Sequence, residues 1–190
     1  MMEISVSRLY LLGGLILHKV VWEILKRRDA RPPKQPGISL KSRVLSIIKI
    51  AILAGIIAQT LAPSVVPISR DAFALEVAGL VIYTLGLLMA IVARLQLGRN
   101  WSDIEKSRVR QDHMLVAHGL YRWVRHPIYA GDLLLLLGLE LALNSWAVAG
   151  IVALAWYIRQ QAAREEKALA ETLPGYAEYC RRTSRFLPGF

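Results

Sequence analysis

Long apolar blocks, separated by short polar and basic segments, dominate the pattern along this chain. Four such blocks with few charges are Leu9–Leu25, Val44–Ala62, Ala72–Ala93 and Pro127–Leu143. Each approaches or reaches the length of a bilayer-spanning α-helix, which takes about 20 residues. A soluble domain would distribute its apolar residues in short amphipathic elements instead. The pattern therefore predicts an all-α, polytopic integral membrane protein.

A fifth apolar block, Trp146–Ile158, is too short to cross a bilayer alone. We expect it to begin a longer helix that runs through Leu173 and leaves the membrane, where Pro174 and Gly175 end it. This gives about five transmembrane helices in one folded domain. We divide the chain into 1–93, with three helices and a basic loop, and 94–190, with a helix hairpin, a polar helix and a basic, aromatic tail.

The charge distribution predicts the topology. The chain has 190 residues, 55% of them hydrophobic, and a formal net charge of +10. Seven lysines and arginines fall within Lys26–Arg43 and seven within Arg94–His126, whereas Arg70 alone lies between the second and third blocks. By the positive-inside rule, both basic loops and the C-terminus face the cytoplasm, and the N-terminus lies outside. The basic residues then face anionic lipid, so we expect membrane lipids and no nucleic acid as partners.

The first polar cluster lies in the sequence HMLVAHGLYRWVRHPIYAG, His113–Gly131. It holds three histidines and two arginines: His113, His118, His126, Arg122 and Arg125. A basic interfacial anchor is one interpretation, since aromatic residues alternate with the cations. The other is an anion site, because the residue before Pro127 is held extended and the first N–H groups of the next helix point back toward it. Such a site suits the carboxylate or phosphate of a cofactor.

The second polar cluster is Arg159 together with Glu165 and Glu166. Arg159 and Glu166 are seven residues apart and share a helix face. A solvated face with a snorkelling arginine is the alternative to a functional site here. Both clusters are expected at the same membrane surface, so they can meet. We expect no metal site, because the histidines lack helical i, i+4 spacing and a nearby carboxylate.

Asp132 and Glu140 are eight residues apart in the fourth block, so they share a helix face. Burying either carboxylate against lipid is costly, and we expect both to face the interior of the bundle. Structural pairing and a role in a substrate path both fit.

These residues resemble a known family. GLYRWVRHPIYAG, Gly119–Gly131, resembles the G-x-Y-x-x-x-R-H-P-x-Y-x-G signature of the membrane methyltransferase superfamily that contains the isoprenylcysteine carboxyl methyltransferases and the phospholipid methyltransferases. The Glu165-Glu166 pair followed by LPGYAEYCRR resembles the end of the same family. Arg99-Asn100-Trp101 fits the carboxyl methyltransferase branch. The resemblance extends from Arg94 to the end.

The resemblance implies a binding site for S-adenosyl-L-methionine at the cytoplasmic face. The cofactor-binding positions it implies are His113, Met114, Leu115, Val116, Tyr121, His126, Pro127, Ile128, Tyr129 and one or both of Glu165 and Glu166. Arg125, Arg159 and Glu166 are the expected catalytic residues. The acceptor would be the carboxylate of a prenylcysteine-like or other lipophilic molecule that enters from the bilayer, and no protein partner is implied. This chain has Gln161 or Ala162 where some carboxyl methyltransferases place an arginine.

Three other functions stay open at this stage. A phospholipid N-methyltransferase would need a base to remove a proton from the acceptor amine, and the sequence offers no unambiguous base. A membrane reductase using NADPH shares a similar tail rich in tyrosine, cysteine and arginine. A non-enzymatic polytopic protein could use the basic loops to bind anionic lipid.

Overall fold

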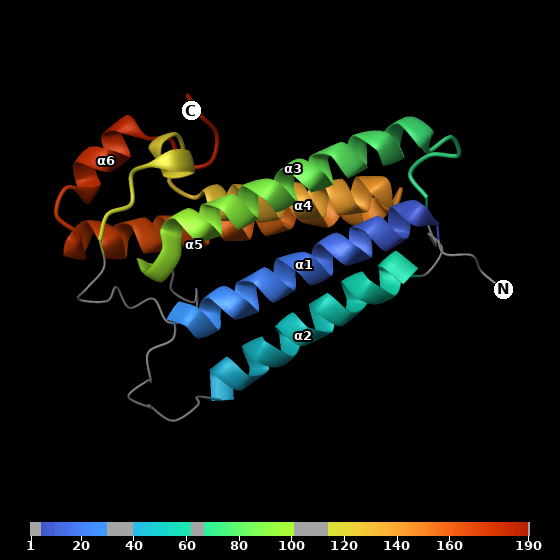
Figure 1. The fold of residues 1–190 in the computed structure, drawn as a ribbon, viewed down its shortest axis with the longest axis horizontal. Coiled ribbons are helices and arrows are strands. Elements are labelled where there is room, and N and C mark those ends of the chain that lie inside the picture. The colour runs from blue at the N-terminus through green and yellow to red at the C-terminus, as the bar shows by residue number, and fades with distance from the viewer. Residues whose placement is uncertain (1–4, 30–39, 62–66, 101–113, 190) are drawn as a thin grey trace.

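The computed structural model describes residues 5–29, 40–61, 67–100 and 114–189, which are helical almost throughout. The α-helices are α1 (Val6–Asp29), α2 (Leu40–Leu61), α3 (Phe73–Leu97), α4 (Pro127–Ala142), α5 (Gly150–Thr172) and α6 (Tyr176–Arg182). Short 3-10 helices are η1 (Gly98–Asn100), η3 (Gly119–Arg122) and η4 (Trp146–Ala149). The all-α prediction is therefore confirmed for these residues. Figure 1 shows α1, α3, α4 and α5 extending along one long axis, with α6 and the C-terminal tail at one end.

The helix boundaries differ from the predicted blocks at several ends. α2 begins at Leu40, within the segment expected to be a loop, because lysine, serine and arginine after it tolerate a helical first turn. Trp146 starts a 3-10 turn rather than the fifth α-helix, since the Ser145 hydroxyl caps the Ala147 N–H at 3.1 Å. α5 then continues to Thr172, so the predicted extension of this helix beyond its apolar block is confirmed.

The centre of the structure is a close pairing of α3 and α4. Gly79 and Gly86 on α3 are seven residues apart, as are Gly131 and Gly138 on α4, so each pair lies on one helix face. A Cβ at Gly79, Gly86 or Gly138 would fall on backbone atoms of the opposite helix, and one at Gly131 would lie 2.6 Å from the Ala90 nitrogen. Small residues thus let the two backbones approach, as in packed transmembrane helices.

Around this seam lies a small apolar core built from three helices. Leu11 of α1, Tyr83 and Leu87 of α3, and Leu135, Leu139 and Leu143 at the end of α4 pack together. The Tyr83 hydroxyl donates a hydrogen bond to the Leu11 carbonyl at 2.6 Å, which satisfies a polar group that is otherwise fully buried. This contact fixes α1 against the α3–α4 pair.

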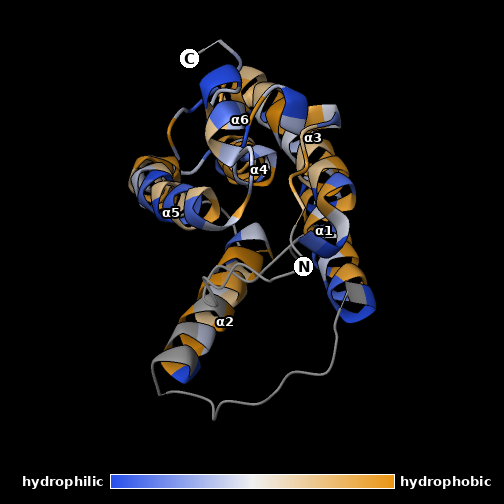
Figure 2. Cartoon of the chain, turned by 90° about the vertical axis from the view of Figure 1, so that its left-hand side faces the viewer, coloured by the Kyte–Doolittle hydropathy of each residue, from blue (hydrophilic) through white to orange (hydrophobic). Residues whose placement is uncertain are grey.

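Much of the apolar surface faces outward. Large hydrophobic side chains are exposed along α1, α2, α3 and the first half of α5, among them Ile16, Ile50, Leu85 and Val152. Figure 2, a view from the end that carries α6, shows hydrophobic residues along these helices and hydrophilic residues on α6. Within the described residues, one segment, Phe73–Asn100, is long and apolar enough to cross a bilayer, and the apolar part of α2, Ser46–Leu61, is shorter.

The end of the bundle opposite α6 holds a polar contact between helices. Glu140 of α4 is buried and accepts a hydrogen bond from the Gln59 side-chain nitrogen of α2 at 2.6 Å. The same nitrogen also donates to the Ser145 hydroxyl at 3.0 Å. Glu140 therefore faces the interior of the bundle, as expected.

Asp132, near the beginning of α4, lies between Glu140 and the end that carries α6. Its carboxylate meets the His18 ring of α1 at 3.0 Å, and His18 in turn stacks on Trp22 with ring centroids 4.1 Å apart. Both acidic residues of the fourth block are thus paired across helices.

Candidate active site

The segment before α4 is shaped by one turn and one side chain. Gly119 begins η3 with φ of +58°, a left-handed conformation that favours glycine. The side chain of Gln96, at the end of α3, occupies the space that a Cβ at this position would need, and its oxygen accepts the Leu120 N–H at 2.8 Å. η3 is therefore held against the end of α3, and the chain leaves it toward His126 and α4.

The C-terminal tail lies alongside this segment. Val124 and Ser184 form a parallel bridge, with the Arg125 N–H donating to the Ser184 carbonyl at 2.8 Å and the His126 N–H to the Arg185 carbonyl at 3.1 Å. One turn earlier, the Tyr179 hydroxyl of α6 donates to the Tyr121 carbonyl at 2.6 Å. Burial raises the pKa of Tyr179 to about 12, so this hydroxyl keeps its proton and stays a donor.

Glu166 connects the segment before α4 and the C-terminal tail to helix α5. Its Oε1 accepts from Arg125 Nε at 2.9 Å, from Arg185 Nε at 3.0 Å and, with the proton on that ring nitrogen, from His126 Nε2 at 3.1 Å. Its Oε2 accepts from Arg185 Nη2 at 2.6 Å. We call these four residues the Glu166 clasp.

The clasp is buried and charged. Glu166 is 9% exposed and His126 8% exposed, so solvent screens these contacts little. Burial alone would raise the pKa of Glu166, but the hydrogen bonds from His126, Arg185 and Arg125 outweigh it and hold this pKa well below its usual range. Glu166 is thus an ionised carboxylate surrounded by cationic and ring N–H donors.

Arg125 extends the clasp to the backbone of α6. Its Nη1 donates to the Cys180 carbonyl at 3.0 Å and also to the Thr183 carbonyl. The last carbonyls of a helix have no partner within it, so one arginine satisfies acceptors at the end of α6 and a carboxylate on α5 together. Arg125 therefore fixes how α6 sits on α5.

Glu165, the neighbour of Glu166, faces a different set of groups. The Tyr129 hydroxyl of α4 donates to Glu165 Oε1 at 2.6 Å, and His126 Nδ1 lies 3.9 Å from Glu165 Oε2. The His126 and Tyr129 rings are nearly parallel, 15° apart with centroids at 5.4 Å, and Phe186 of the tail lies 5.9 Å from His126. The His126 imidazole thus lies between the two glutamate side chains, beside the rings of Tyr129 and Phe186.

The two predicted clusters therefore meet, since His126, Tyr129, Arg125, Glu165 and Glu166 come together. Pro127 is buried at the first position of α4, and Ile128 is half-buried beside it. Tyr121 is buried under α6. Pro127 begins α4 as predicted, but the expected extended backbone of His126 is wrong, because its φ of −123° combines with a ψ of +59°.

The other predicted residues that the structure describes make no hydrogen bond or ion pair with this centre. Met114 is 72% exposed, with its N–H on the Asn100 side-chain oxygen at 2.9 Å, and Leu115 and Val116 are half-buried. His113 lies outside the described residues. Arg159 is exposed on α5, seven residues from the buried Glu166, and Gln161 is buried between them.

Two tail residues in the site were missed by sequence reasoning. Arg185 supplies two of the hydrogen bonds to Glu166, and Phe186 packs on His126. The signal in the sequence was an arginine and an aromatic residue three and four positions after the basic end of α6. Within the described part of the chain, no group of three His, Cys, Asp or Glu side chains lies close enough to hold a metal ion.

Comparison with known proteins connects this geometry to one family. The model of the isoprenylcysteine carboxyl methyltransferase (ICMT) family matches residues 77–171. The cobalt-zinc-cadmium resistance protein CzcN of Cupriavidus metallidurans is 39% identical over 107 residues, which cover 55% of this chain and 48% of that protein. The protein-S-isoprenylcysteine O-methyltransferase of Schizosaccharomyces pombe is 30% identical over 107 residues, covering 55% and 45%. This chain thus spans about half the length of the curated relatives it matches.

A solved structure shares the fold. The eukaryotic intramembrane Ras methyltransferase ICMT, determined without a monobody, superposes with a TM-score of 0.64 at 19% identity, covering 98% of this chain and 69% of that one.

Proposed function

This chain belongs to the isoprenylcysteine carboxyl methyltransferase family, and from that membership we propose that it is an integral-membrane methyltransferase dependent on S-adenosyl-L-methionine. Its acceptor is the carboxylate of a prenylcysteine-like or other lipophilic molecule, methylated at the cytoplasmic face. The observation that carries the proposal is the convergence of the two motifs, because His126 and Tyr129 of one contact Glu166 and Glu165 of the other.

The residues at the beginning of α4 fit the chemistry of this cofactor. The cofactor carries a sulfonium, an ammonium, a carboxylate, ribose hydroxyls and a flat adenine ring. Glu165 offers a carboxylate whose described contacts are the Tyr129 hydroxyl and the distant His126 ring. The N–H groups of Ile128 and Tyr129 lie in the first turn of α4, where no partner exists within the helix, and they suit a carboxylate. The parallel His126 and Tyr129 rings offer flat aromatic surface.

We propose different roles for the two glutamates. Glu166 accepts four hydrogen bonds, three of them from arginines, and so has little capacity left for a ligand. Glu165 is the carboxylate that meets the cofactor's ammonium or ribose hydroxyls. Arg125 and Glu166, expected to be catalytic, then act as positioning residues that hold the tail and His126 in place.

Met114, Leu115, Val116 and Tyr121, with His113, stay in the proposed cofactor site on the strength of the family motif. Met114, Leu115 and Val116 lie shortly before η3, which Gln96 ties to the end of α3. Arg159 stays a proposed contact for the acceptor's anionic group, because it follows the apolar part of α5 directly.

The chain's own groups need to supply little chemistry beyond placement. When bound, the cofactor supplies an electrophilic methyl group on its sulfonium sulfur. A carboxylate acceptor is ionised at neutral pH, so no metal and no strong base are required. Holding two reactants in line at close distance is worth effective molarities of about 10⁵ M or more. The Glu166 clasp contributes by keeping the cofactor site closed and ordered around His126.

We propose that the chain crosses the membrane about five times, with the N-terminus outside and the site at the cytoplasmic surface. Exposed apolar side chains along α1, α2, α3 and the first half of α5 support this placement. Single cysteines placed at Lys34 and Lys106, in a Cys180→Ser background, should react with an impermeant maleimide only from the cytoplasmic side. One at Ser69 should react only from outside, and opposite accessibility of Lys34 and Lys106 would refute the five-span topology.

Ligand binding by the detergent-purified protein tests the function. S-adenosylhomocysteine should raise the thermal midpoint and bind with micromolar-scale affinity, because a ligand that binds only the folded state stabilises it by mass action. NADPH should do neither. Transfer of a radiolabelled methyl group to a small prenylated thiol-acid, compared with a phosphatidylethanolamine acceptor, then distinguishes a carboxylate acceptor from an amine acceptor. An absence of both heat and thermal shift with S-adenosylhomocysteine would refute the proposal.

A further inference from the structure

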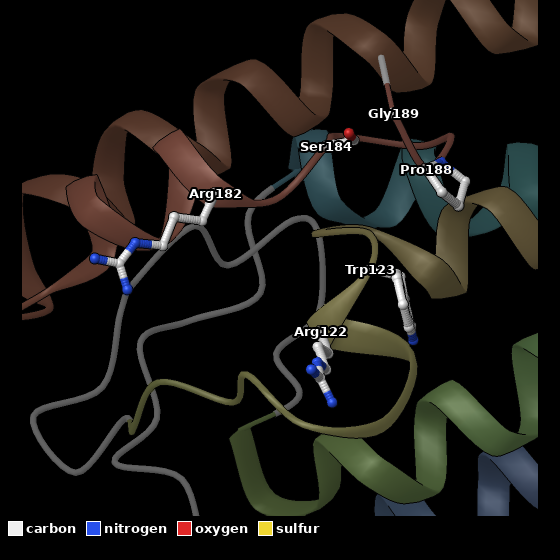
Figure 3. A pocket seen from close by; sticks show the side chains of 6 residues that line it. All are labelled: Arg122, Trp123, Arg182, Ser184, Pro188 and Gly189. Carbon is white, nitrogen blue, oxygen red and sulfur yellow. The ribbon is translucent and has the colours of Figure 1, made fainter.

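A concave feature lies beside the segment that leads into α4. It is a pocket of about 420 Å³, formed where η3 meets the C-terminal tail. Its lining residues are Arg122, Trp123, Arg182, Ser184, Pro188 and Gly189. Figure 3 shows the first two on the η3 segment and the other four on the end of α6 and the tail. We call it the tail pocket.

The tail pocket is separate from the cofactor site. Along the η3 segment, Tyr121 and Val124 are buried, whereas Arg122 and Trp123 between them are exposed. Tyr121 and Val124 therefore face inward, under α6 and the tail, whereas Arg122 and Trp123 face outward and line the pocket. None of the lining residues belongs to the Glu166 clasp or contacts Glu165.

The lining has the chemistry of an anion site. Arg122 and Arg182 come from different segments, and the Ser184 side chain adds a hydroxyl. Figure 3 shows the two guanidinium groups directed apart. Arg122 lies over the Trp123 ring at 5.6 Å, and Arg182 pairs through Nε with Glu178 at 2.7 Å. Among the described residues, no acidic side chain lines the pocket. A planar guanidinium with several N–H donors matches phosphate oxygens well.

The rim is apolar and exposed. Trp123, which lines the pocket, is 61% exposed, and Leu187, the neighbour in sequence of the lining residue Pro188, is 65% exposed. Trp123 lies four residues before Pro127, where α4 begins. Tryptophan and arginine gather at the depth of lipid headgroups, so this rim suits a ligand with an anionic head and an apolar body.

We propose that the tail pocket binds the phosphate of an anionic phospholipid of the cytoplasmic leaflet and so holds the tail on the cofactor site. Both side chains are exposed, so a phosphate could draw the two guanidinium groups over the pocket and connect η3 to the end of α6. Ser184 sits in the same pocket, and its carbonyl accepts from Arg125 of the Glu166 clasp. Lipid in this pocket would therefore stabilise the arrangement that orders His126. The position at the membrane surface, and the effect on the cofactor, rest on the proposed function.

The test compares the full chain reconstituted in nanodiscs of phosphatidylcholine, with and without phosphatidylglycerol. Lipid retained by the protein is measured by native mass spectrometry, and the thermal midpoint by intrinsic fluorescence. Phosphatidylglycerol should be retained and should raise the midpoint. Arg122→Gln and Arg182→Gln should each weaken retention about tenfold, the effect of losing one charged hydrogen bond. Circular dichroism confirms that each variant is folded.

Arg181→Gln is the matched control. Arg181 and Arg182 are neighbours on α6, both are exposed, and both pair with Glu178, but only Arg182 lines the pocket. Equal loss of retention in both variants would mean diffuse attraction to a basic surface and would overturn the proposal. So would stabilisation by soluble glycerol phosphate or inorganic phosphate with no preference for the lipid.

The regulatory part has its own measurement. S-adenosylhomocysteine affinity should be several-fold higher in discs that contain phosphatidylglycerol, and this gain should disappear in Arg122→Gln. Binding of S-adenosylhomocysteine in phosphatidylcholine alone tests the proposed function without the pocket. Retained phosphatidylglycerol with no S-adenosylhomocysteine binding in either disc would refute the function and leave the lipid site standing, whereas the reverse pattern would refute the lipid site.

Discussion

Two buried glutamates lie near opposite ends of the bundle, and their partners differ in kind. Glu140 of α4 is 6% exposed and contacts a neutral amide, the Gln59 side chain of α2. Glu166 of α5 is 9% exposed and contacts two arginines and a histidine. Similar burial therefore accompanies very different electrostatics. The Glu140 end joins helices within the apolar bundle, whereas the Glu166 end concentrates charge.

The difference indicates which end can bind an ionic ligand. A buried cluster of cations and carboxylates is stable only if every member keeps its partner, so its geometry is well defined. Such a cluster can hold His126 and the tail in one arrangement beside Glu165. At the other end, Glu140 accepts from the neutral Gln59 amide, and Arg8 of α1 donates to the Gln59 and Thr60 carbonyls, which suits a contact between helices.

Removing the central carboxylate should have the largest effect. Glu166→Ala leaves Arg125, Arg185 and His126 without their shared acceptor in a buried site, and breaking such a contact costs about 3 kcal/mol or more. We expect a large fall in the thermal midpoint in detergent and loss of measurable S-adenosylhomocysteine binding. Glu178→Gln, which removes an exposed pair on α6, is the control and should change neither quantity. A thermal midpoint equal to that of the wild type in Glu166→Ala would show that the Glu166 clasp does not stabilise the fold.

Replacing the neighbouring carboxylate should affect binding instead of stability. Glu165→Gln keeps an oxygen for the Tyr129 hydroxyl but removes the charge that we assign to the cofactor. S-adenosylhomocysteine binding should weaken by about 1.5–3 kcal/mol, the usual value for a hydrogen bond to a charged group, with an unchanged midpoint in the absence of ligand. Calorimetric titration measures this, with Glu171→Gln on the exposed part of α5 as control. Unchanged affinity would transfer the cofactor role to another residue.

Acid should weaken the Glu166 end selectively. The pKa of Glu166 in the folded state lies below its ordinary value of 4.5, so the unfolded chain binds this proton more readily. The stabilisation is complete above about pH 4.5 and is lost as the pH falls toward the folded-state pKa, at about 1.4 kcal/mol for each pH unit. The midpoint of the wild type should thus fall between about pH 5 and pH 3 more steeply than that of Glu166→Gln. Parallel curves for the two proteins would contradict this assignment.

The sequence predicted that the two motifs meet, but not which role each of their residues has. The placement of both basic segments at one surface predicted that His126 and Glu166 could meet, and Pro127 predicted where α4 begins. Glu165 and Glu166 are adjacent, however, and a helix turn of 100° separates their directions without saying which one faces the tail. That choice depends on Arg185, which a turn after α6 brings back to α5.

The sequence contains one sign of the close pairing of α3 and α4, a repeated spacing of glycines. Gly79 and Gly86 recur at the same seven-residue spacing as Gly131 and Gly138. The length and hydropathy of the apolar blocks predict membrane-spanning helices, but not which of these helices pack against one another. Partners in a helix bundle are set by shape on both surfaces, and one helix sequence carries only half of that information.

The smallest effect should come from the glutamate with neutral partners. Glu140→Gln keeps a side-chain oxygen that can accept from Gln59 Nε2 and preserves the volume of the side chain. We therefore expect the thermal midpoint to change by the equivalent of less than about 1 kcal/mol, and S-adenosylhomocysteine affinity to stay at its wild-type value. The matched change at the other end, Glu166→Gln, supplies the comparison, because its amide can accept but brings no charge to two arginines and also presents an N–H to them. Equal destabilisation by the two Glu→Gln substitutions would mean that Glu140 is ionised and electrostatically paired, which would remove the contrast between the two ends of the bundle.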